Sequence, residues 1–440
     1  MPALRFADIA VNLSDGSFVG RQRGRQAHVS DLNAVLARAA AAGVTRLLAT
    51  GTDLAESRAT LRLARTRGGG FDLVDVRCTV GVHPTCCGQF EEEPTGARNE
   101  AKAGAGEAEG TGGSGAERGA GEAQGAGGSE AKGGAGEAEG TGESGAIAAG
   151  KGAESSSAPT EASSAGCGCS QPRGGSVGGA SAAPRGEALL AALRALAIEG
   201  ASDGRVAALG EMGLDGEREH FCALDTQARW FERQLRDVCR GLGLPLFLHL
   251  RGDEAVAARF FDILDRNEDC WRAAGGVVHS FDGSAETLRG VLDRGLHVGL
   301  NGCSVREARS LEVVKRIPLD RLLLETDSPW CGVRRTHAGA ALVETWPAAV
   351  DAKRLDRKLD ELAKARAERR EPGEGRDAGA LAPCGLPLPL AAWPQIKGRN
   401  EPANVVQVAE IVAATRGESL RAVAEAAAAN AVALFWKKIR

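Results

Sequence analysis

The chain has 440 residues, of which 43% are hydrophobic, and a formal net charge of −4; this length supplies a large core and, taken alone, up to two domains. It shows no secretory leader and no apolar run long enough to span a bilayer, which disfavours secreted and membrane proteins. Its eleven cysteines show no paired C-x-x-C spacing, so a zinc ribbon is disfavoured. We expect free thiols and a soluble intracellular protein, in the nucleus or the cytoplasm.

Apolar runs typical of strands alternate with helical patterns along most of the chain. Strands are predicted at 4–12, 44–50, 73–82, 205–213, 244–250, 275–281, 296–302 and 321–327, and helices at 30–42, 53–67, 187–199, 224–241, 253–266, 284–294, 305–316, 402–415 and 418–436. Such alternation indicates an α/β protein built from parallel βα units. Eight units favour a TIM-type (βα)8 barrel over an open sheet. We therefore expect one domain over residues 1–440, interrupted by two insertions.

The first insertion is a Gly/Ala/Glu/Ser-rich tract over residues 94–186. Its repeat, GAGEAEG or GAGEAQG, occurs three times with a period of 15 residues. Because the tract carries almost no large apolar residues, it cannot form a core, and we predict that it is disordered. Residues 91–161 hold 14 Glu against 5 Lys and Arg, so the remainder of the chain carries a net charge of +5. That balance is compatible with a polyanionic substrate.

The second insertion is predicted at residues 340–394. The segment 351–371, DAKRLDRKLDELAKARAERRE, has the pattern of a charged, solvated helix, and a Pro/Gly-rich return follows it. A helix that binds a partner is the alternative for this segment.

Ligand-type side chains lie at the ends of several predicted strands. They are Glu211, His249, His279 and Asp327. One such histidine would be explained as a core residue bonded to a backbone carbonyl, but the pattern recurs on four strands, and chemistry in parallel barrels gathers at the carboxyl ends of strands. Imidazole suits zinc, and carboxylates suit magnesium or manganese. These residues therefore form a candidate site for one or two divalent cations.

Four further polar residues are candidates for substrate binding. His83 lies at a third strand end, and a turn histidine before a proline is the alternative. Arg251 could face a phosphate or form a surface salt bridge. Arg399 and Asn400 precede a predicted helix, where Asn400 could instead serve as a helix cap.

Several motifs, in order, resemble the TatD family of metal-dependent deoxyribonucleases, and within it the eukaryotic branch. They are FADIAVNLSD, VGVHPTCCGQF, LGEMGLD, LPLFLHLR, GGVVHSFDG, VGLNGCS, LLLETDSPWCGVRRTHAG and GRNEPANV. The resemblance implies a (βα)8 barrel and hydrolysis of DNA phosphodiester bonds by a metal-activated water. It carries metal binding onto Glu211, His249, His279 and Asp327. It also makes Asp327 and Glu211 the catalytic carboxylates, Asp327 as the base and Glu211 as a bridge between two metals.

The first strand departs from the family pattern. Many members have H-x-H at its end, whereas this chain has Ala10 and Asn12 at those places. Two alternatives to a deoxyribonuclease therefore stay open: a metal-dependent deacylase acting on aminoacyl-tRNA, which would use the same activated water, and a non-catalytic binding protein. DNA is the expected partner, and the sequence indicates no membrane and no obligate protein partner.

Overall fold

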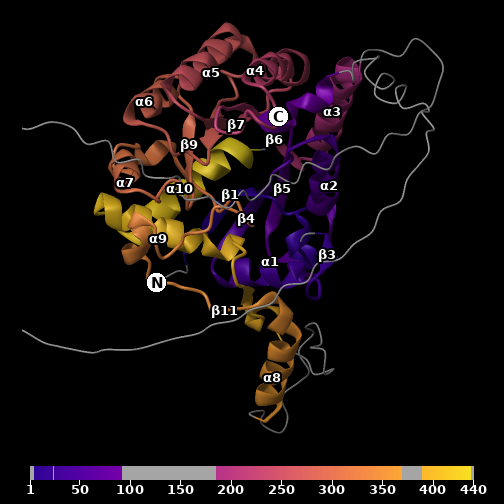
Figure 1. Ribbon diagram of the computed structural model, residues 1–440, viewed down its shortest axis with the longest axis vertical. Helices are drawn as coiled ribbons and strands as arrows, with labels where there is room; N and C mark the ends of the chain where they lie inside the picture. The colour runs from indigo at the N-terminus through magenta and orange to yellow at the C-terminus, as the bar shows by residue number, and fades with distance from the viewer. Residues whose placement is uncertain (1–3, 23, 92–184, 369–388, 438–440) are drawn as a thin grey trace, which may run out of the picture. The chain divides into compact units, whose positions relative to one another are not determined.

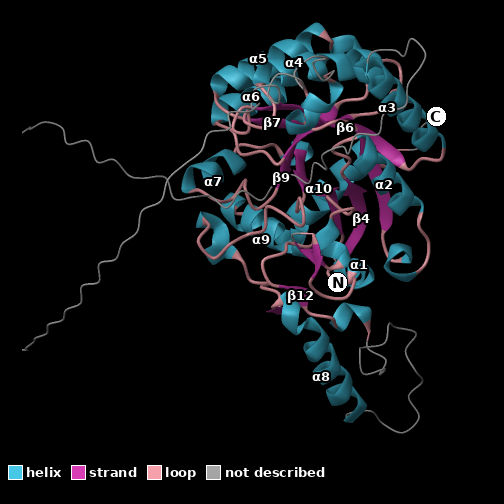
Figure 2. Cartoon of the chain, turned by 45° about the vertical axis from the view of Figure 1, so that its right-hand side comes forward, coloured by secondary structure: helices cyan, strands magenta, loops and turns pink. Residues whose placement is uncertain are grey.

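The eight predicted strands form one sheet in a computed structural model that describes residues 4–22, 24–91, 185–368 and 389–437. The strands are β1 (Phe6–Val11), β4 (Val44–Ala49), β5 (Asp75–Val80), β6 (Val206–Asp215), β7 (Leu246–Arg251), β8 (Gly276–His279), β9 (His297–Leu300) and β10 (Leu322–Leu324). They pair in chain order, each neighbouring pair parallel. In Figure 2 the strands are enclosed by helices. The prediction of a TIM-type (βα)8 barrel is confirmed.

The sheet closes between β1 and the segment that follows β10. The backbone N–H of Asp327 donates to the carbonyl of Ala10, and that of Asn12 donates to Ser328, both at 2.8 Å. The predicted last strand, 321–327, therefore ends as regular structure at Leu324 but continues the barrel wall as an irregular segment. The closure places the carboxyl end of β1 directly beside Asp327.

The barrel is surrounded by helices that correspond to those predicted. They are α1 (Leu32–Ala41), α2 (Leu54–Arg65), α3 (Arg185–Ser202), α4 (Leu224–Arg233), which continues as a π-helix (Gln234–Cys239), α5 (Glu254–Arg266), α6 (Ala285–Asp293), α7 (Ala308–Val314), α9 (Val405–Arg416) and α10 (Leu420–Phe435). Figure 1 shows α4, α5 and α6 side by side outside the strands. Several begin at side chains that accept a backbone N–H of the first turn, namely Asp53, Asp253, Ser284 and Ser419. Such caps explain why these helices begin where they do.

The end of α10 covers the amino end of the barrel. Phe435 and Trp436 join a buried cluster with inward-facing side chains such as Ile9 and Phe247. The indole N–H of Trp436 donates to Asp75, the first residue of β5, at 2.8 Å. The carboxyl ends of the strands, where polar residues gather, are therefore the end that remains for chemistry.

The second insertion is anchored to the barrel rather than wholly solvated. Its helix α8 (Leu355–Glu368) contributes Leu355, Leu359 and Ala363 to a buried cluster that also contains Trp393, Ile396 and Ala34 of α1. The short strands β11 (Ala349–Val350) and β12 (Gln395–Ile396) pair at its base. The expectation of a solvated helix was therefore wrong for one face, because its apolar residues recur at every fourth position. The return segment over 369–388 lies outside the described residues.

The predicted disordered tract over 94–186 lies, apart from its last two residues, outside the described residues. A short hairpin of β2 (Arg21–Gln22) and β3 (Arg25–Gln26) precedes α1. Among the helices that the structure describes, none is both long and apolar enough to cross a membrane.

The closure of the barrel depends on a buried carboxyl group, which allows a test of its stability. Asp8 accepts the backbone N–H of Thr326 at 2.9 Å and its hydroxyl at 2.6 Å. We expect Thr326→Val to lower the free energy of unfolding by about 1–3 kcal/mol, because it leaves a buried acceptor without this partner. Thr326→Ser, which keeps the hydroxyl, should cost less. Urea unfolding measures both, and equal stability of the Val and wild-type proteins would contradict this account.

Candidate metal and catalytic centre

Three of the four predicted metal ligands lie in neighbouring strands at the carboxyl end of the barrel. Glu211 belongs to β6, His249 to β7, and His279 is the last residue of β8. The register pairs His249 with Gly213 on one side and with His279 on the other. Side chains that share a register row on adjacent parallel strands face the same side of the sheet, which brings His249 and His279 together. Glu211, from the neighbouring strand β6, reaches both rings at hydrogen-bond distance.

One oxygen of Glu211 is the point on which the imidazoles converge. Its Oε1 lies 2.8 Å from Nδ1 of His249, 2.7 Å from Nε2 of His279 and 3.4 Å from Nε2 of His83. The carboxylate and all three rings are buried. His83, predicted as a substrate contact, therefore lies among the ligand-type side chains instead.

Two glycines hold the backbone around Glu211 in a conformation that other residues rarely adopt. Gly210 and Gly213 have φ of 140° and 149°, and a Cβ on either would lie within 2.0 Å of a carbonyl oxygen, that of Phe247 or His249. The β6–β7 register also shifts between Leu209 and Met212, so Glu211 lies at the irregularity. The motif LGEMG thus supplies the close strand approach that directs the carboxylate inward.

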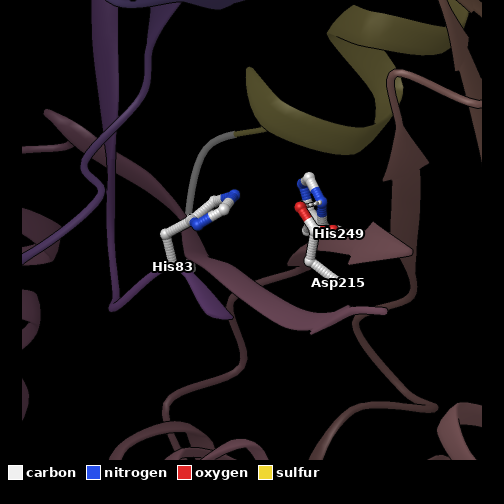
Figure 3. Close-up of side chains that lie close together, drawn as sticks. All are labelled: His83, Asp215 and His249. Carbon is white, nitrogen blue, oxygen red and sulfur yellow. Dashed lines mark hydrogen bonds and ion pairs between the residues drawn. The ribbon is translucent and has the colours of Figure 1, made fainter. Parts of the chain in front are cut away.

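A second group of ligand-type atoms adjoins the first. His83, Asp215 and His249 have ligand atoms within 4.8 Å of one another, as do Glu211, His249 and His279. In Figure 3 the ring of His83 points toward that of His249, beside which the Asp215 carboxylate lies. The sequence analysis missed Asp215, because the predicted strand ended at residue 213. The signal was present, since Asp215 ends the same apolar run.

The charges in this cluster balance one another. Burial raises the pKa of Glu211, but the charge of the protonated His279 and the hydrogen bonds from His249 and His279 lower it more, so the pKa of Glu211 lies well below the usual range. Burial lowers the pKa of His279, but the charges of Glu211 and Glu325 raise it by a larger amount. The pKa of His279 therefore lies well above its usual range. For His83, burial dominates and lowers the pKa to about 3, which leaves a neutral imidazole available as a ligand.

Asp327 lies beside the cluster but in neither of the two tight groups. Its Oδ1 accepts from the side-chain amide of Asn12 at 2.9 Å, and its Oδ2 accepts from the thiol of Cys331 at 3.2 Å. Burial raises the pKa of Asp327 to about 6, although the charge of His279 opposes the shift. Asn12, which stands where many relatives have a histidine, therefore contacts Asp327 through its amide.

Glu325 lies in the layer beneath the cluster. Its carboxylate accepts from the backbone N–H of Ser280 at 2.6 Å and from Asn301 at 3.0 Å, and lies 3.5 Å from Nδ1 of His279. A carboxylate on the second nitrogen of an imidazole fixes the ring's orientation and tautomer, so that the first nitrogen faces a ligand. Glu325 is thus placed to orient His279.

The remaining predicted substrate contacts have protein partners. Arg251 pairs with Asp282 at 2.9 Å and also donates to Ser280. Arg399 forms buried ion pairs with Asp31 at 2.6 Å and with Glu401 at 2.7 Å. Neither carboxylate is a candidate metal ligand. The alternative interpretation of Arg251, a salt bridge, matches the observed contact with Asp282. That salt bridge is mostly buried rather than on the surface.

Asn400 supports the loop that carries Asp327. Its amide donates to the carbonyls of Thr326 and Trp330 at 2.9 and 2.8 Å, and its oxygen accepts from the backbone N–H of Glu401. The helix cap of α9 is Asn404 rather than Asn400. The position of Asn400 therefore indicates a brace for the turn after β10.

The donor set suits a divalent cation. Two buried carboxylates and three buried imidazoles crowd together, and carboxylate oxygen and imidazole nitrogen are the ligands that zinc and the harder divalent cations take. Without a cation, protonated histidines supply the positive charge next to Glu211. A cation can replace those protons, since metal binding to such residues releases protons.

Comparison with known proteins identifies relatives across the described fold. The family described as TatD related DNase matches residues 177–436. A protein of Schizosaccharomyces pombe named Deoxyribonuclease Tat-D is 39% identical over 255 residues, which cover 57% of this chain and 68% of that protein. Its namesake in Saccharomyces cerevisiae is 28% identical over 450 residues, which cover 95% and 88%.

Solved structures share the fold. An uncharacterized amidohydrolase from Saccharomyces cerevisiae matches with a TM-score of 0.64 at 23% identity, covering 98% of this chain and all of that one. A hydrolase of the TatD family from Entamoeba histolytica matches with a TM-score of 0.62 at 20% identity, covering 99% of both chains. At these identities the likeness establishes the barrel fold and no more.

Proposed function

The chain belongs to the TatD family of DNases, and from this premise we propose that it is a metal-dependent deoxyribonuclease that hydrolyses phosphodiester bonds in DNA. Family membership makes it a hydrolase that acts on ester bonds. One observation carries the finer proposal: the carboxylate of Glu211 meets three imidazole nitrogens within 3.4 Å at the carboxyl end of the barrel. Relatives with names such as 3'-5' ssDNA/RNA exonuclease TatD, 42% identical over 143 residues in Cronobacter turicensis, support a nucleic acid as substrate.

Glu211, His249 and His279 would hold the cation, with His83, Asp215 and Asp327 as further candidate ligands. When bound, a divalent cation lowers the pKa of a water and offsets the charge that develops on the phosphate. Asp327 would take the proton of the attacking water, because its carboxylate lies beside the cluster and a bound cation would keep it ionised. Asn12 holds one oxygen of Asp327 and so leaves the carboxylate in a defined orientation.

The test is an assay on the purified full chain. After treatment with EDTA, the protein is incubated with single-stranded DNA labelled at one end, with Mg²⁺, Mn²⁺ or Zn²⁺ restored separately. We expect cleavage only after a metal is restored. Release of the amino acid from charged tRNA without cleavage of DNA would instead favour the deacylase. A shift of DNA in a gel-shift assay, without turnover of either substrate, would favour the alternative of a non-catalytic binding protein.

An exposed aromatic ring six residues after Asp215 predicts a contact with a base. Phe221 is 53% exposed, and its ring lies 4.2 Å from that of His220. Its loop is held at the centre, because Arg218 donates to Asp215 at 2.9 Å and the backbone N–H of Phe221 donates to Arg218. Stacking of a base on such a ring contributes about 1–3 kcal/mol, so Phe221→Ala should raise KM for single-stranded DNA by roughly 5- to 150-fold and change kcat little.

Two variants control this measurement. Phe221→Tyr keeps an aromatic face and should keep the wild-type KM. Ile198→Ala removes a side chain of similar exposure, 50%, from α3 on the outside of the barrel, and should also leave KM unchanged. If Phe221→Ala binds DNA as the wild type does, this ring does not contact the substrate.

A further inference from the structure

The loops after β9 and β10 bring two cysteine sulfurs together beside Asp327. Cys303 lies three residues after β9, and its thiol donates to Cys331 Sγ at an S–S separation of 3.3 Å. The backbones of the two loops are also in contact: a Cβ on Gly302 would lie 2.1 Å from the carbonyl oxygen of Cys331, so no larger residue fits there. The sulfurs therefore face each other because the two loops are packed together.

This pair differs in exposure from the other thiols. The structure records seven free cysteines in the described part of the chain, and Cys303 and Cys331 are the two that are partly exposed. The other five, Cys78, Cys87, Cys222, Cys239 and Cys270, are buried. Because reactivity of a thiol requires access, these two cysteines are the candidates for reaction with a small oxidant in solution.

The pair is also connected to the candidate centre. The thiol of Cys331 donates to Oδ2 of Asp327 at 3.2 Å, and Oδ1 of the same carboxylate accepts from Asn12. One of the two contacts that orient Asp327 therefore depends on a sulfur that still carries its hydrogen. A change in the oxidation state of Cys331 removes that contact.

We propose that Cys303 and Cys331 form a reversible dithiol–disulfide site that hydrogen peroxide oxidises. One sulfur attacks a peroxide oxygen, the O–O bond breaks, and a sulfenic acid and one water result. The second sulfur attacks the sulfenic sulfur, the S–S bond forms, and a second water leaves, so two thiols are oxidised and one peroxide is reduced. Closing the sulfurs from 3.3 Å to the disulfide length of about 2.05 Å requires only a small movement of either side chain. A thiol reductant reverses the step.

The first experiment measures the bond itself. The reduced full chain is treated with hydrogen peroxide, free thiols are alkylated, and proteolytic peptides are analysed by mass spectrometry. We expect one cross-linked peptide that joins Cys303 to Cys331, with a loss of about 2 Da from the disulfide and recovery on addition of dithiothreitol. Peroxide that adds oxygen to either sulfur without a cross-link, or leaves both thiols alkylated, would overturn the site.

The second experiment measures the effect on hydrolysis, and this part rests on the proposed function. Loss of a hydrogen bond to a charged group predicts that oxidation lowers kcat at least about tenfold and that dithiothreitol restores it. Cys303→Ser should keep the basal activity and lose the sensitivity to peroxide, whereas Cys270→Ser should remain sensitive. A cross-link with unchanged kcat would remove the connection to Asp327. A protein without nuclease activity would refute the proposed function, and the peptide measurement would still decide the disulfide.

Discussion

Glu211→Gln is expected to abolish metal binding and to lower DNA hydrolysis by at least about 100-fold, since a bound cation contributes several kcal/mol to the transition state. The carboxylate oxygen of Glu211 meets three imidazoles, and no other described carboxylate has this arrangement. Glutamine keeps the size but replaces a charged oxygen with a neutral one. Metal content after dialysis, by elemental analysis, and the initial rate of cleavage of labelled DNA measure the two effects.

Glu410→Gln is the matched control. Glu410 is also buried, but it accepts the backbone N–H groups of Glu344 and Thr345, at 3.0 and 3.2 Å, away from the centre. The amide oxygen of glutamine can accept both, so this variant should keep its metal and its activity. If Glu211→Gln retains one equivalent of metal and cleaves DNA as the wild type does, the cluster around Glu211 is not the metal centre.

Asp327→Asn is expected to lower kcat by at least about 100-fold, the low end of a general-base contribution, while the fold survives. Asparagine can still accept from the amide of Asn12, so the contacts of the loop are largely kept. What is lost is the basic oxygen. Because Asp327 lies in neither tight group of ligand atoms, this variant should retain more metal than Glu211→Gln. Circular dichroism, metal content and single-turnover rates distinguish these effects.

Glu325→Gln separates the role of the base from that of a nearby buried carboxylate. Glu325 accepts from Ser280 and Asn301 and lies beside the second nitrogen of His279. Loss of such an outer contact to a metal-binding histidine costs about tenfold or somewhat more, so this variant should be more active than Asp327→Asn. Near-wild-type hydrolysis by Asp327→Asn with its metal unchanged would remove Asp327 from the mechanism.

Together Glu211→Gln and Asp327→Asn separate cation binding from proton transfer. Loss of metal in Glu211→Gln, and loss of rate with metal retained in Asp327→Asn, would assign the two roles to different residues. Equal loss of metal in both would indicate that Asp327 is an essential ligand, which the resemblance to the TatD family also implied.

The architecture could be predicted because its signals are local. Most of the eight strands are short, largely apolar runs that are buried on both faces, and many helices have an amphipathic period and, in several cases, a capping residue. A regular alternation of the two leaves few topologies, since parallel strands need crossover helices between them. Element boundaries were less well predicted where the chain becomes irregular, as at residues 325–327, where hydrogen bonds to β1 replace a regular strand.

The residue types of the centre could also be predicted, but their neighbours could not. Glu211, His249 and His279 lie toward the carboxyl ends of three strands that follow one another along the chain, so a parallel barrel brings them together. The contact of His83 and Asp215 with His249 depends on side-chain directions in a turn after β5 and beyond the register shift of β6, where a regular period-2 alternation cannot be read from the sequence. For His83, the sequence could not distinguish the role of a substrate-binding residue from that of a metal ligand.

Contacts between distant segments were decided only by tertiary structure. Arg399 lies next to Asn400 in the sequence, yet one enters ion pairs with Asp31 and Glu401, and the other braces the turn that carries Asp327. Cys303 and Cys331 follow different strands, and only the packing of their loops joins the sulfurs. Periodicity and spacing report which face of an element is apolar, whereas a polar contact depends on where two loops end in space. The chain's order of elements and its ligand types are therefore properties of the sequence, and the pairing of its polar side chains is a property of the closed barrel.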